Sequence, residues 1–350
     1  MRGHETSHAR PRPRRPAAHR AARARTYQRP PAGYTPVFTE NVSRHGSRAA
    51  TGGEDGDLVL ALWDKAQAED QLTEKGEEFG PAVRALTAAM QQVGYGNLSG
   101  RGRQEMRDTA TRMEQRLPTL FARIADEGEK IDVVSSGQGR AVDSANEYTG
   151  ALAAADPALK PLIGPIRTDE DLLYFHKAAG GAAYRDYIAN DQRLKDTLNA
   201  ITDQPRTHEA ARSVLRRIFK EPFADAITDQ VDFFQQAEAK RAGTSDLGAE
   251  LRFTHAEEII PLAALMGLPG STEPATPGEP YTYADNPWRG ASVAPLGADI
   301  QWDVYEKDGR YLVRMLYNEK ETPFRAGCRP IAEDSAFYDL DELERCFGRA

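Results

Sequence analysis

The sequence of 350 residues contains little cysteine and no pattern of metal ligands. Its two cysteines, Cys328 and Cys346, both lie near the C-terminus, and no CxxC or Cys/His zinc spacing is present. We therefore expect no metal site. The two cysteines are consistent with one disulfide in an oxidising compartment or with two buried thiols, and the sequence alone leaves both open.

The sequence also lacks long apolar runs. None approaches the roughly 18–20 residues of a transmembrane helix, so no membrane span is expected. A secretory signal needs an apolar stretch of roughly 7–15 residues after its charges, and none follows the N-terminal arginines. No export signal is therefore visible.

Outside the N-terminus, acidic residues outnumber basic ones. The first 34 residues carry nine arginines, no lysine and one acid, Glu5, for a net charge of +8. The whole chain has a formal charge of −8, so the remaining 316 residues carry −16. This acidic body excludes a protein that coats nucleic acid with its whole surface.

The basic N-terminus is rich in Arg, Pro and Ala and has no apolar periodicity. It cannot bury enough surface to offset its chain entropy, so residues 1–33 are predicted to form a disordered leader. Its arginines fit either an arm for nucleic acid or anionic membrane, or a solvated tail. Tyr27 is the only aromatic residue interleaved with them, which favours the tail. We expect no nucleic-acid partner.

The rest of the chain alternates between strand-like and helix-like segments. A hydrophobic fraction of 40% is enough for a core, which excludes a disordered chain. Strands are predicted where short apolar runs end in polar residues, and helices where apolar residues recur at helical spacing. The expected strands are 36–42, which alternates as a half-buried strand does, 131–136, 250–254, and a hairpin of 300–305 and 311–317 around Lys307-Asp308-Gly309. The expected helices are two within 57–93, one from about 97–102 to Leu120, 141–154, 259–266 closed by Gly267, and a last one near 339–346.

The middle of the chain differs in polarity and in secondary-structure signals from both ends. Residues 156–245 are polar, helical and poor in strand signals, which predicts an inserted helical cap. Residues 34–155 and 246–350 would then form one α/β core. His176 and His208 lie in the predicted insertion and are interpreted as solvated surface histidines. Basic residues there fit either a solvated helical face or the mouth of a site: Lys160, Lys177, Arg185, Arg193 and Lys195.

Three predicted strands end in charged or small polar residues. Arg44-His45-Gly46-Ser47-Arg48 follows the first, Arg140 comes shortly after the second, and His255-Ala256-Glu257 follows the third. In α/β sheets the ligand site lies beyond the carboxyl ends of the strands. We therefore expect one crevice that contains two histidines, three arginines and a carboxylate.

This set of side chains suits phosphoryl transfer. Planar guanidinium groups match phosphate oxygens and neutralise their charge. A neutral imidazole is a competent nucleophile, and a carboxylic acid can protonate the leaving oxygen. Helix N-terminal amides would also attract the anion. Nothing in the set requires a metal, and we expect no cofactor.

The motif Arg-His-Gly-x-Arg after a strand, followed in order by the other two, resembles the histidine phosphatase superfamily, in the branch of histidine acid phosphatases and phytases. Within that branch three features are similar to multiple inositol polyphosphate phosphatases. They are Ser136–Ala145, the His255-Ala256-Glu257 sequence in place of the commoner His-Asp, and Asn318-Glu319-Lys320 leading to Cys328. The resemblance extends over roughly residues 34–347.

The resemblance implies a fold and a reaction. The fold is a phosphoglycerate-mutase-like α/β core, with a mixed sheet flanked by helices and an inserted helical cap. The reaction is hydrolysis of inositol polyphosphates, phytate included, by a monomeric phosphomonoesterase. His45 would become phosphohistidine, and Glu257 would protonate the leaving oxygen and then help water attack. The phosphate would be held by Arg44, Arg48, Arg140 and His255.

Two features depart from the family pattern. Ala50 stands where the family usually has proline, a change that loosens the loop of Arg48 without removing a reacting group. Family members are usually exported, which implies a secreted or cell-envelope protein, yet no export signal is visible.

Rival functions remain open on the sequence alone. A broad-specificity acid phosphatase or a bisphosphoglycerate phosphatase would need the same machinery. A catalytically silent polyphosphate-binding protein would need only the arginines, and a partner-binding protein would act through its basic leader.

Overall fold

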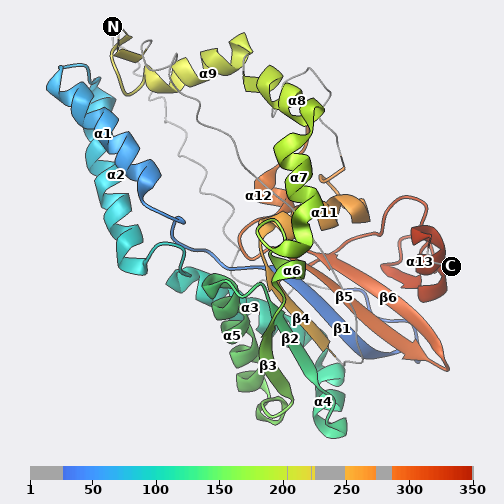
Figure 1. The fold of residues 1–350 in the computed structure, drawn as a ribbon. Coiled ribbons are helices and arrows are strands. Elements are labelled where there is room, and N and C mark those ends of the chain that lie inside the picture. Colours follow the sequence, from blue (N-terminus) through green and yellow to red (C-terminus); the bar gives the residue numbers. More distant parts are fainter. Residues whose placement is uncertain (1–26, 203, 222, 225–248, 273–285, 349–350) are drawn as a thin grey trace, which may run out of the picture.

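The computed structural model describes residues 27–202, 204–221, 223–224, 249–272 and 286–348 (Figure 1). Their centre is an eight-stranded mixed sheet in the order β3-β2-β4-β1-β5-β6-β7, with β8 paired to β6. The strands are β1 (Thr35–Arg44), β2 (Ile131–Ser135), β3 (Ile163–Thr168), β4 (Ala249–Thr254), β5 (Asp299–Lys307), β6 (Arg310–Tyr317), β7 (Lys320–Glu321) and β8 (Phe337–Asp339).

Helices cover both faces of this sheet, as the predicted α/β class requires. One face packs against α3 (Gly100–Arg116), α4 (Pro118–Glu127) and α5 (Gly139–Ala155). The other packs against α11 (Ala256–Met266), α12 (Gly290–Val293) and α13 (Leu340–Phe347). The remaining helices are α1 (Glu54–Ala68), α2 (Glu74–Val93), η1 (Pro157–Leu159), α6 (Glu170–Leu173), η2 (Ala179–Gly181), α7 (Ala182–Asn190), α8 (Gln192–Thr202) and α9 (Pro205–Leu215).

The parallel half of the sheet aligns the three strand ends that the sequence singled out. Strands β3, β2, β4 and β1 are parallel neighbours, whereas β5 and β6 run antiparallel. In register, Arg44 pairs with Thr254, and Ser135 pairs with Phe253. The residues that follow β1, β2 and β4 therefore emerge side by side at one edge, as predicted.

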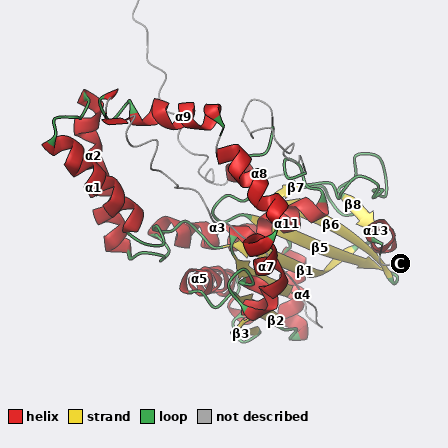
Figure 2. Cartoon of the chain, turned by 45° about the horizontal axis from the view of Figure 1, so that its top comes forward, coloured by secondary structure: helices red, strands yellow, loops and turns green. Residues whose placement is uncertain are grey.

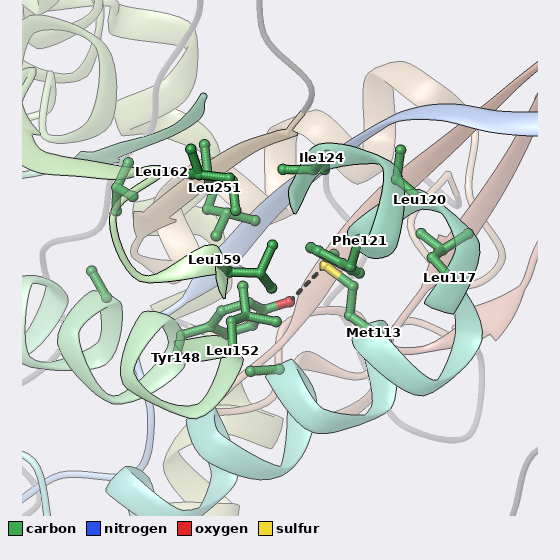
Figure 3. Packing of buried hydrophobic residues seen from close by; sticks show 14 of the residues in the cluster. Met113, Leu117, Leu120, Phe121, Ile124, Tyr148, Leu152, Leu159, Leu162 and Leu251 are labelled. Atoms are coloured by element: carbon green, nitrogen blue, oxygen red, sulfur yellow. Dashed lines mark hydrogen bonds between the residues drawn. The ribbon is translucent and has the colours of Figure 1, made fainter. Parts of the chain in front are cut away.

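A hydrophobic cluster holds α3, α4 and α5 against the sheet (Figure 3). Apolar side chains along one stripe of each helix meet Leu251 of β4, and the buried Tyr148 hydroxyl donates to Met113 Sδ at 3.2 Å. Burying each such side chain contributes about 1.5–3 kcal/mol before its entropy cost. A second cluster on the opposite face includes Ile259, Ala263 and Ile300. The strand ends thus sit on a rigid support.

Strand β1 is more buried than its alternating pattern predicts. The expected half-buried strand is wrong for its C-terminal part, where Thr39, Asn41 and Ser43 are buried together with Val42. Polar side chains can be buried there because they have partners. Thr39 Oγ1 donates to Asp303 Oδ1 at 3.0 Å, and Asn41 Nδ2 donates to Ser43 Oγ at 2.8 Å.

Turn and capping residues predicted the positions of most helices and strands correctly, but some of the predicted boundaries are wrong. The turn of the predicted hairpin has positive φ at Asp308 (51°) and Gly309 (78°), and Gly267 (68°) ends α11 as expected. The single helix predicted to reach Leu120 is wrong, because α3 ends at Arg116 and Pro118 starts α4. Proline is tolerated at a first helical position, where its missing N–H costs nothing.

Two segments differ from their predicted structure, one expected to be helical and one expected to be disordered. Strand β3 lies inside the stretch expected to be a helical cap and pairs in parallel with β2.

Disorder was predicted up to residue 33, but residues 27–33 are ordered against the core. The Gln28 amide donates to Glu321 Oε1 at 2.7 Å, and Arg314 Nη1 donates to Gln28 O at 3.0 Å. These bonds to folded partners anchor the segment; residues 1–26 of the predicted leader lie outside the described residues.

An arm of α7, α8 and α9 projects from the sheet and meets the far end of the α1–α2 hairpin (Figures 1 and 2). Leu72 and Phe219 form a β-bridge, the Thr73 amide donates to Ile218 O at 3.0 Å, and the Lys220 amide donates to Gln71 O at 2.8 Å. Trp63 and Phe219 are both buried in a small apolar cluster at this junction. The arm and the α1–α2 hairpin are therefore joined at their far ends by hydrogen bonds and apolar contacts.

Near the C-terminus, Cys328 and Cys346 form a disulfide with a Cα–Cα distance of 5.3 Å, which decides between the two alternatives left by the sequence. None of the helices in the described ranges combines the length and the apolar character needed to cross a bilayer.

Candidate active site

His45 is the first residue after β1 and its backbone is fixed on both sides. Its amide donates to Thr254 O at 2.8 Å, and its carbonyl accepts from the Gly297 amide at 3.1 Å. The side chain is only 2% exposed. The strand end therefore presents a histidine whose position is set by β4 and by the loop before β5.

The hydrogen bond of the His45 ring assigns its tautomer. Nδ1 lies 2.9 Å from Gly46 O. A carbonyl oxygen only accepts, so Nδ1 carries the proton and Nε2 keeps a free lone pair. Burial lowers the pKa of His45 to about 3, helped by the charges of Arg44, Arg140 and Arg48 and opposed by the bond to Gly46. The ring is neutral, with a nucleophilic nitrogen on Nε2.

Three arginines surround this histidine, each with an unused donor. Arg44 Nη1 donates to Ala294 O at 2.5 Å, and Arg48 Nη1 donates to Ala49 O at 2.7 Å. The Nε atoms of Arg44, Arg48 and Arg140 are buried and have no hydrogen-bond partner among the described residues. Buried donors are normally satisfied, so these point to an anionic ligand that would accept from them.

The charges of the three arginines act on one another, as they do when their guanidinium groups lie close together. Burial is the largest cause that lowers the pKa of Arg44 and of Arg48, and the charge of Arg140 lowers both further. The charge of Glu257 acts on both in the opposite sense. Three cations and one carboxylate therefore share one partly water-excluded volume, where each charge acts more strongly than on the surface.

The loop of Arg48 is held by α3. Both carboxylate oxygens of Glu105 accept from Ser47, one from its amide and one from its hydroxyl, each at 2.9 Å. The backbones of Gly46 and Gly102 also touch, since a Cβ added at Gly46 would lie 2.4 Å from Gly102 O. A glycine at this contact is required by the close approach rather than by an unusual φ.

His255, the first residue after β4, faces His45 across the strand ends. The two rings lie 5.3 Å apart, edge to face. Ser136, the first residue after β2, places its Oγ 2.7 Å from His255 Nε2. Burial, with the charges of His45 and Arg140, pushes the pKa of His255 far below its usual value. His255 is therefore a neutral hydrogen-bonding group.

Two consecutive glutamates follow His255 and face different ways. Glu257 is half-buried and acts electrostatically on Arg44 and Arg48. Glu258 is buried beneath the first turn of α11, where its Oε2 accepts from the His255 amide at 3.3 Å. Of the two, Glu257 is the carboxylate that faces the arginines.

The structure thus brings all six predicted site residues to one edge of the sheet. It corrects the interpretation of His176, which is not on the surface but 7% exposed, with its ring 6.2 Å from that of His255. His208 is half-buried on α9, and Arg185 Nη1 donates to Phe175 O at 3.1 Å. Sequence reasoning also gave no role to Ser136 or Tyr174, whose ring lies 5.1 Å from His255.

Metal ligands are not gathered here. Within the described ranges, no three His, Cys, Asp or Glu side chains lie close enough to hold a metal ion. The donors at the site are arginine and histidine nitrogens, which suit an anion.

Comparison with profiles of known protein families identifies the family to which this chain belongs. The family profile described as histidine phosphatase superfamily (branch 2) matches residues 38–240, more than half of the chain. The chain belongs to this superfamily. The match includes the segments of His45 and Arg140, in agreement with the resemblance seen in the sequence.

Solved structures agree with this assignment. The chain is similar to a multiple inositol polyphosphate phosphatase of Bifidobacterium longum in complex with phosphate, at 26% identity and a TM-score of 0.81, with 92% of this chain and 94% of that chain covered. The same protein in complex with inositol hexasulfate gives a TM-score of 0.80 at the same identity and coverage. A phytase from D. castellii, at 13% identity, a TM-score of 0.53 and coverage of 91% and 80%, shares the fold. The histidine phosphatase fold and a phosphatase activity are therefore supported.

Proposed function

We propose that the protein hydrolyses phosphomonoesters of inositol, phytate and lower inositol polyphosphates included, through a phosphohistidine intermediate. The observation that carries this proposal is the neutral His45, with Nε2 free, inside a set of three arginines with unused buried donors. A phosphorylated small molecule is the proposed partner, and the inositol class rests on likeness to the Bifidobacterium longum enzyme.

In the first step, the lone pair of His45 Nε2 attacks phosphorus and the ester P–O bond breaks. The negative charge on the phosphoryl oxygens is stabilised by Arg44, Arg48 and Arg140, with His255 as a further donor. Glu257, protonated at the start, gives its proton to the leaving inositol oxygen. The products are the free hydroxyl and a phosphohistidine.

In the second step, water attacks the phosphoryl group and the N–P bond breaks. The Glu257 carboxylate formed in the first step takes the proton from that water and is restored to its acid form. His45 regains its lone pair on Nε2, while Nδ1 keeps its proton on Gly46 O throughout. Two steps with one carboxyl group thus return the enzyme to its starting state.

The proposal is tested by phosphate release from phytate without added metal, in wild type and in His45→Ala. Loss of the nucleophile should reduce the rate by about 10⁴-fold or more. Equal release by the two proteins would overturn the mechanism. Trapping of ³²P on wild type but not on the variant would identify the covalent intermediate.

Substrate choice needs its own comparison. We expect kcat/KM for phytate to exceed that for 2,3-bisphosphoglycerate and for simple alkyl phosphates. A preference for 2,3-bisphosphoglycerate, or equal values for all substrates, would keep the chemistry and replace the inositol assignment. Binding of phytate without any turnover would instead identify a silent polyphosphate-binding protein.

A further inference from the structure

A buried histidine and a buried glutamate face one another beside the site, and the reaction described above uses neither. His176 is 7% exposed and Glu258 is 4% exposed. His176 Nδ1 lies 3.8 Å from Glu258 Oε1, and neither of these atoms has a hydrogen-bond partner among the described residues. The gap is within ion-pair range and only about 0.9 Å longer than a hydrogen bond.

The segment that carries His176 is held firmly at the carboxyl edge of the sheet. It connects α6 with η2, and Arg185 of α7 donates to the carbonyls of Phe175 and Ala178 on either side of the histidine. The His176 ring packs edge to face on Tyr174 at 4.6 Å. Tyr174 in turn lies against the ring of His255. His176 therefore belongs to a packed layer that includes the site.

Glu258 links this layer to the catalytic turn. Its Oε2 accepts from the His255 amide, and Glu257 is the residue immediately before it. Burial raises the pKa of Glu258, while the side chains of His176 and Thr254 oppose that rise. Glu258 Oε1 itself has no hydrogen-bond partner among the described residues, which is costly for a buried carboxylate oxygen, and His176 Nδ1 faces it at 3.8 Å.

We propose that His176 is a positioning residue, whose Nδ1–H holds Glu258 and thereby orients the first turn of α11 with Glu257. The inference rests on the proposed function, because it assigns a role in aiming the proton donor. The Glu258 side chain transmits the position of the α6–η2 segment to the His255-Ala256-Glu257 turn. His176 itself does not touch the reacting atoms.

The proposal predicts a dependence on the leaving group. An inositol alkoxide needs a proton as it leaves, whereas p-nitrophenolate does not. If His176 aims Glu257, its loss slows phytate hydrolysis more than hydrolysis of p-nitrophenyl phosphate. A residue that only stabilises the fold would lower both rates by the same factor.

Two substitutions separate the ring of His176 from its donor. His176→Phe keeps an aromatic ring against Tyr174 and removes the N–H. His176→Asn removes the ring and places an amide N–H near the position of Nδ1. We expect the ratio of kcat for phytate to kcat for p-nitrophenyl phosphate to fall about tenfold in His176→Phe. In His176→Asn the ratio should stay within about threefold of wild type.

Glu258→Gln and Glu257→Gln complete the test. Glu258→Gln keeps an oxygen for the His255 amide but turns a donor toward Nδ1, so the ratio should fall as in His176→Phe. If the thermal midpoint of His176→Phe shows that this variant does not fold, Glu258→Gln tests the positioning role in its place. Glu257→Gln removes the acid itself and should give the largest fall.

The outcomes separate the inference from the proposed function. An unchanged ratio in both His176→Phe and Glu258→Gln overturns the positioning role and leaves the phosphatase intact. A ratio that falls in His176→Asn but not in His176→Phe assigns the role to ring packing and also overturns it. A wild-type protein that hydrolyses neither substrate overturns the proposed function, and the inference with it.

Discussion

At the scale of single residues, burial rather than sequence decides the charge of the central histidine. His45 is enclosed by the sheet edge and surrounded by cationic side chains, and both effects disfavour its protonated form. A histidine on the surface would be largely charged at pH 5. His45 stays neutral there, which keeps the lone pair of Nε2 available in mildly acidic solution.

This gives a pH prediction for the free enzyme. The imidazole ¹⁵N signals of His45, assigned by comparison with His45→Gln, should report a neutral Nδ1–H tautomer from pH 8 down to about pH 4.5, because the pKa is lowered to about 3. The unfolded chain binds this proton near pH 6.5, so the contribution of His45 to stability decreases as pH falls from about 6.5 toward 3. A midpoint near 6.5 in the folded protein would contradict the assignment.

Sequence reasoning found the residues whose signal is local and missed those that depend on distant contacts. Arg44, His45 and Arg48 sit within five residues at a strand end, a pattern that can be read directly. His176 directly follows the apolar run Leu172–Phe175, but the neighbouring Lys177 and the polar residues beyond it favour a surface interpretation. Its environment comes from His255 and Glu258, about 80 residues away, which only the fold brings close.

At the scale of elements, α3 supports the loop that follows β1. The backbones of the loop and the helix touch at two glycines, and a Cβ added at Gly102 would lie 2.1 Å from Ser47 O. Backbone cannot rotate away as a flexible side chain can. The position of Arg48 is therefore coupled to the identity of a residue on another element.

Gly102→Ala tests this coupling. The added methyl must displace the loop or the start of α3, which should cost roughly 1–3 kcal/mol of stability and lower kcat/KM about tenfold or more. Gly100→Ala in the same helical turn is the matched control, because its Cβ would meet nothing within 4 Å. Chemical denaturation and phosphatase assays compare the two. Equal effects would show that the contact does not position Arg48.

Elements were predictable where one strong local rule operated, and otherwise were not. The hairpin at Asp308-Gly309 needed only its turn residues, both at positive φ. Strand β3 carries Gly164 and Pro165 and gave no strand signal; it exists because β2 offers a partner edge. The prediction of a single helix up to Leu120 overlooked Pro118, whose ring favours the first turn of a new helix.

At the scale of the whole molecule, net charge is a poor guide to the site. The chain is acidic overall, yet three arginines meet at the strand ends, where water is partly excluded. Behind them, a buried polar layer joins β1 and β5 to α3. Asp303 accepts from Arg116 Nε at 3.0 Å and from Arg314 Nη2 at 2.8 Å, with all three side chains buried.

A second carboxylate in this layer, Asp299, has an environment of the opposite kind. Burial raises its pKa, and the nearby charge of Glu319 raises it further. Its Oδ1 accepts from the Glu319 amide at 3.0 Å. For Asp303, by contrast, the charges of Arg116 and Arg314 outweigh burial and leave its pKa lowered. The two aspartates should therefore respond to pH with opposite signs.

Asp299→Asn and Asp303→Asn test this pair by urea denaturation between pH 4 and 8. The native state holds the proton of Asp299 more tightly than the unfolded chain, so its contribution to stability is present below about pH 4 and is lost as pH rises through the raised pKa. Asp299→Asn should thus gain stability relative to wild type as pH increases. Asp303→Asn removes the carboxylate that the buried Arg116 and Arg314 share, although Arg314 keeps its ion pair with Glu321, and should lose about 3–5 kcal/mol at pH 7. That loss should stay constant between pH 4 and 8 and shrink only in stronger acid, where the unfolded chain binds the proton of Asp303 while the folded carboxylate, with its lowered pKa, still stays ionised. Parallel pH curves for wild type and Asp299→Asn would show that Asp299 is ionised in the folded protein across this range.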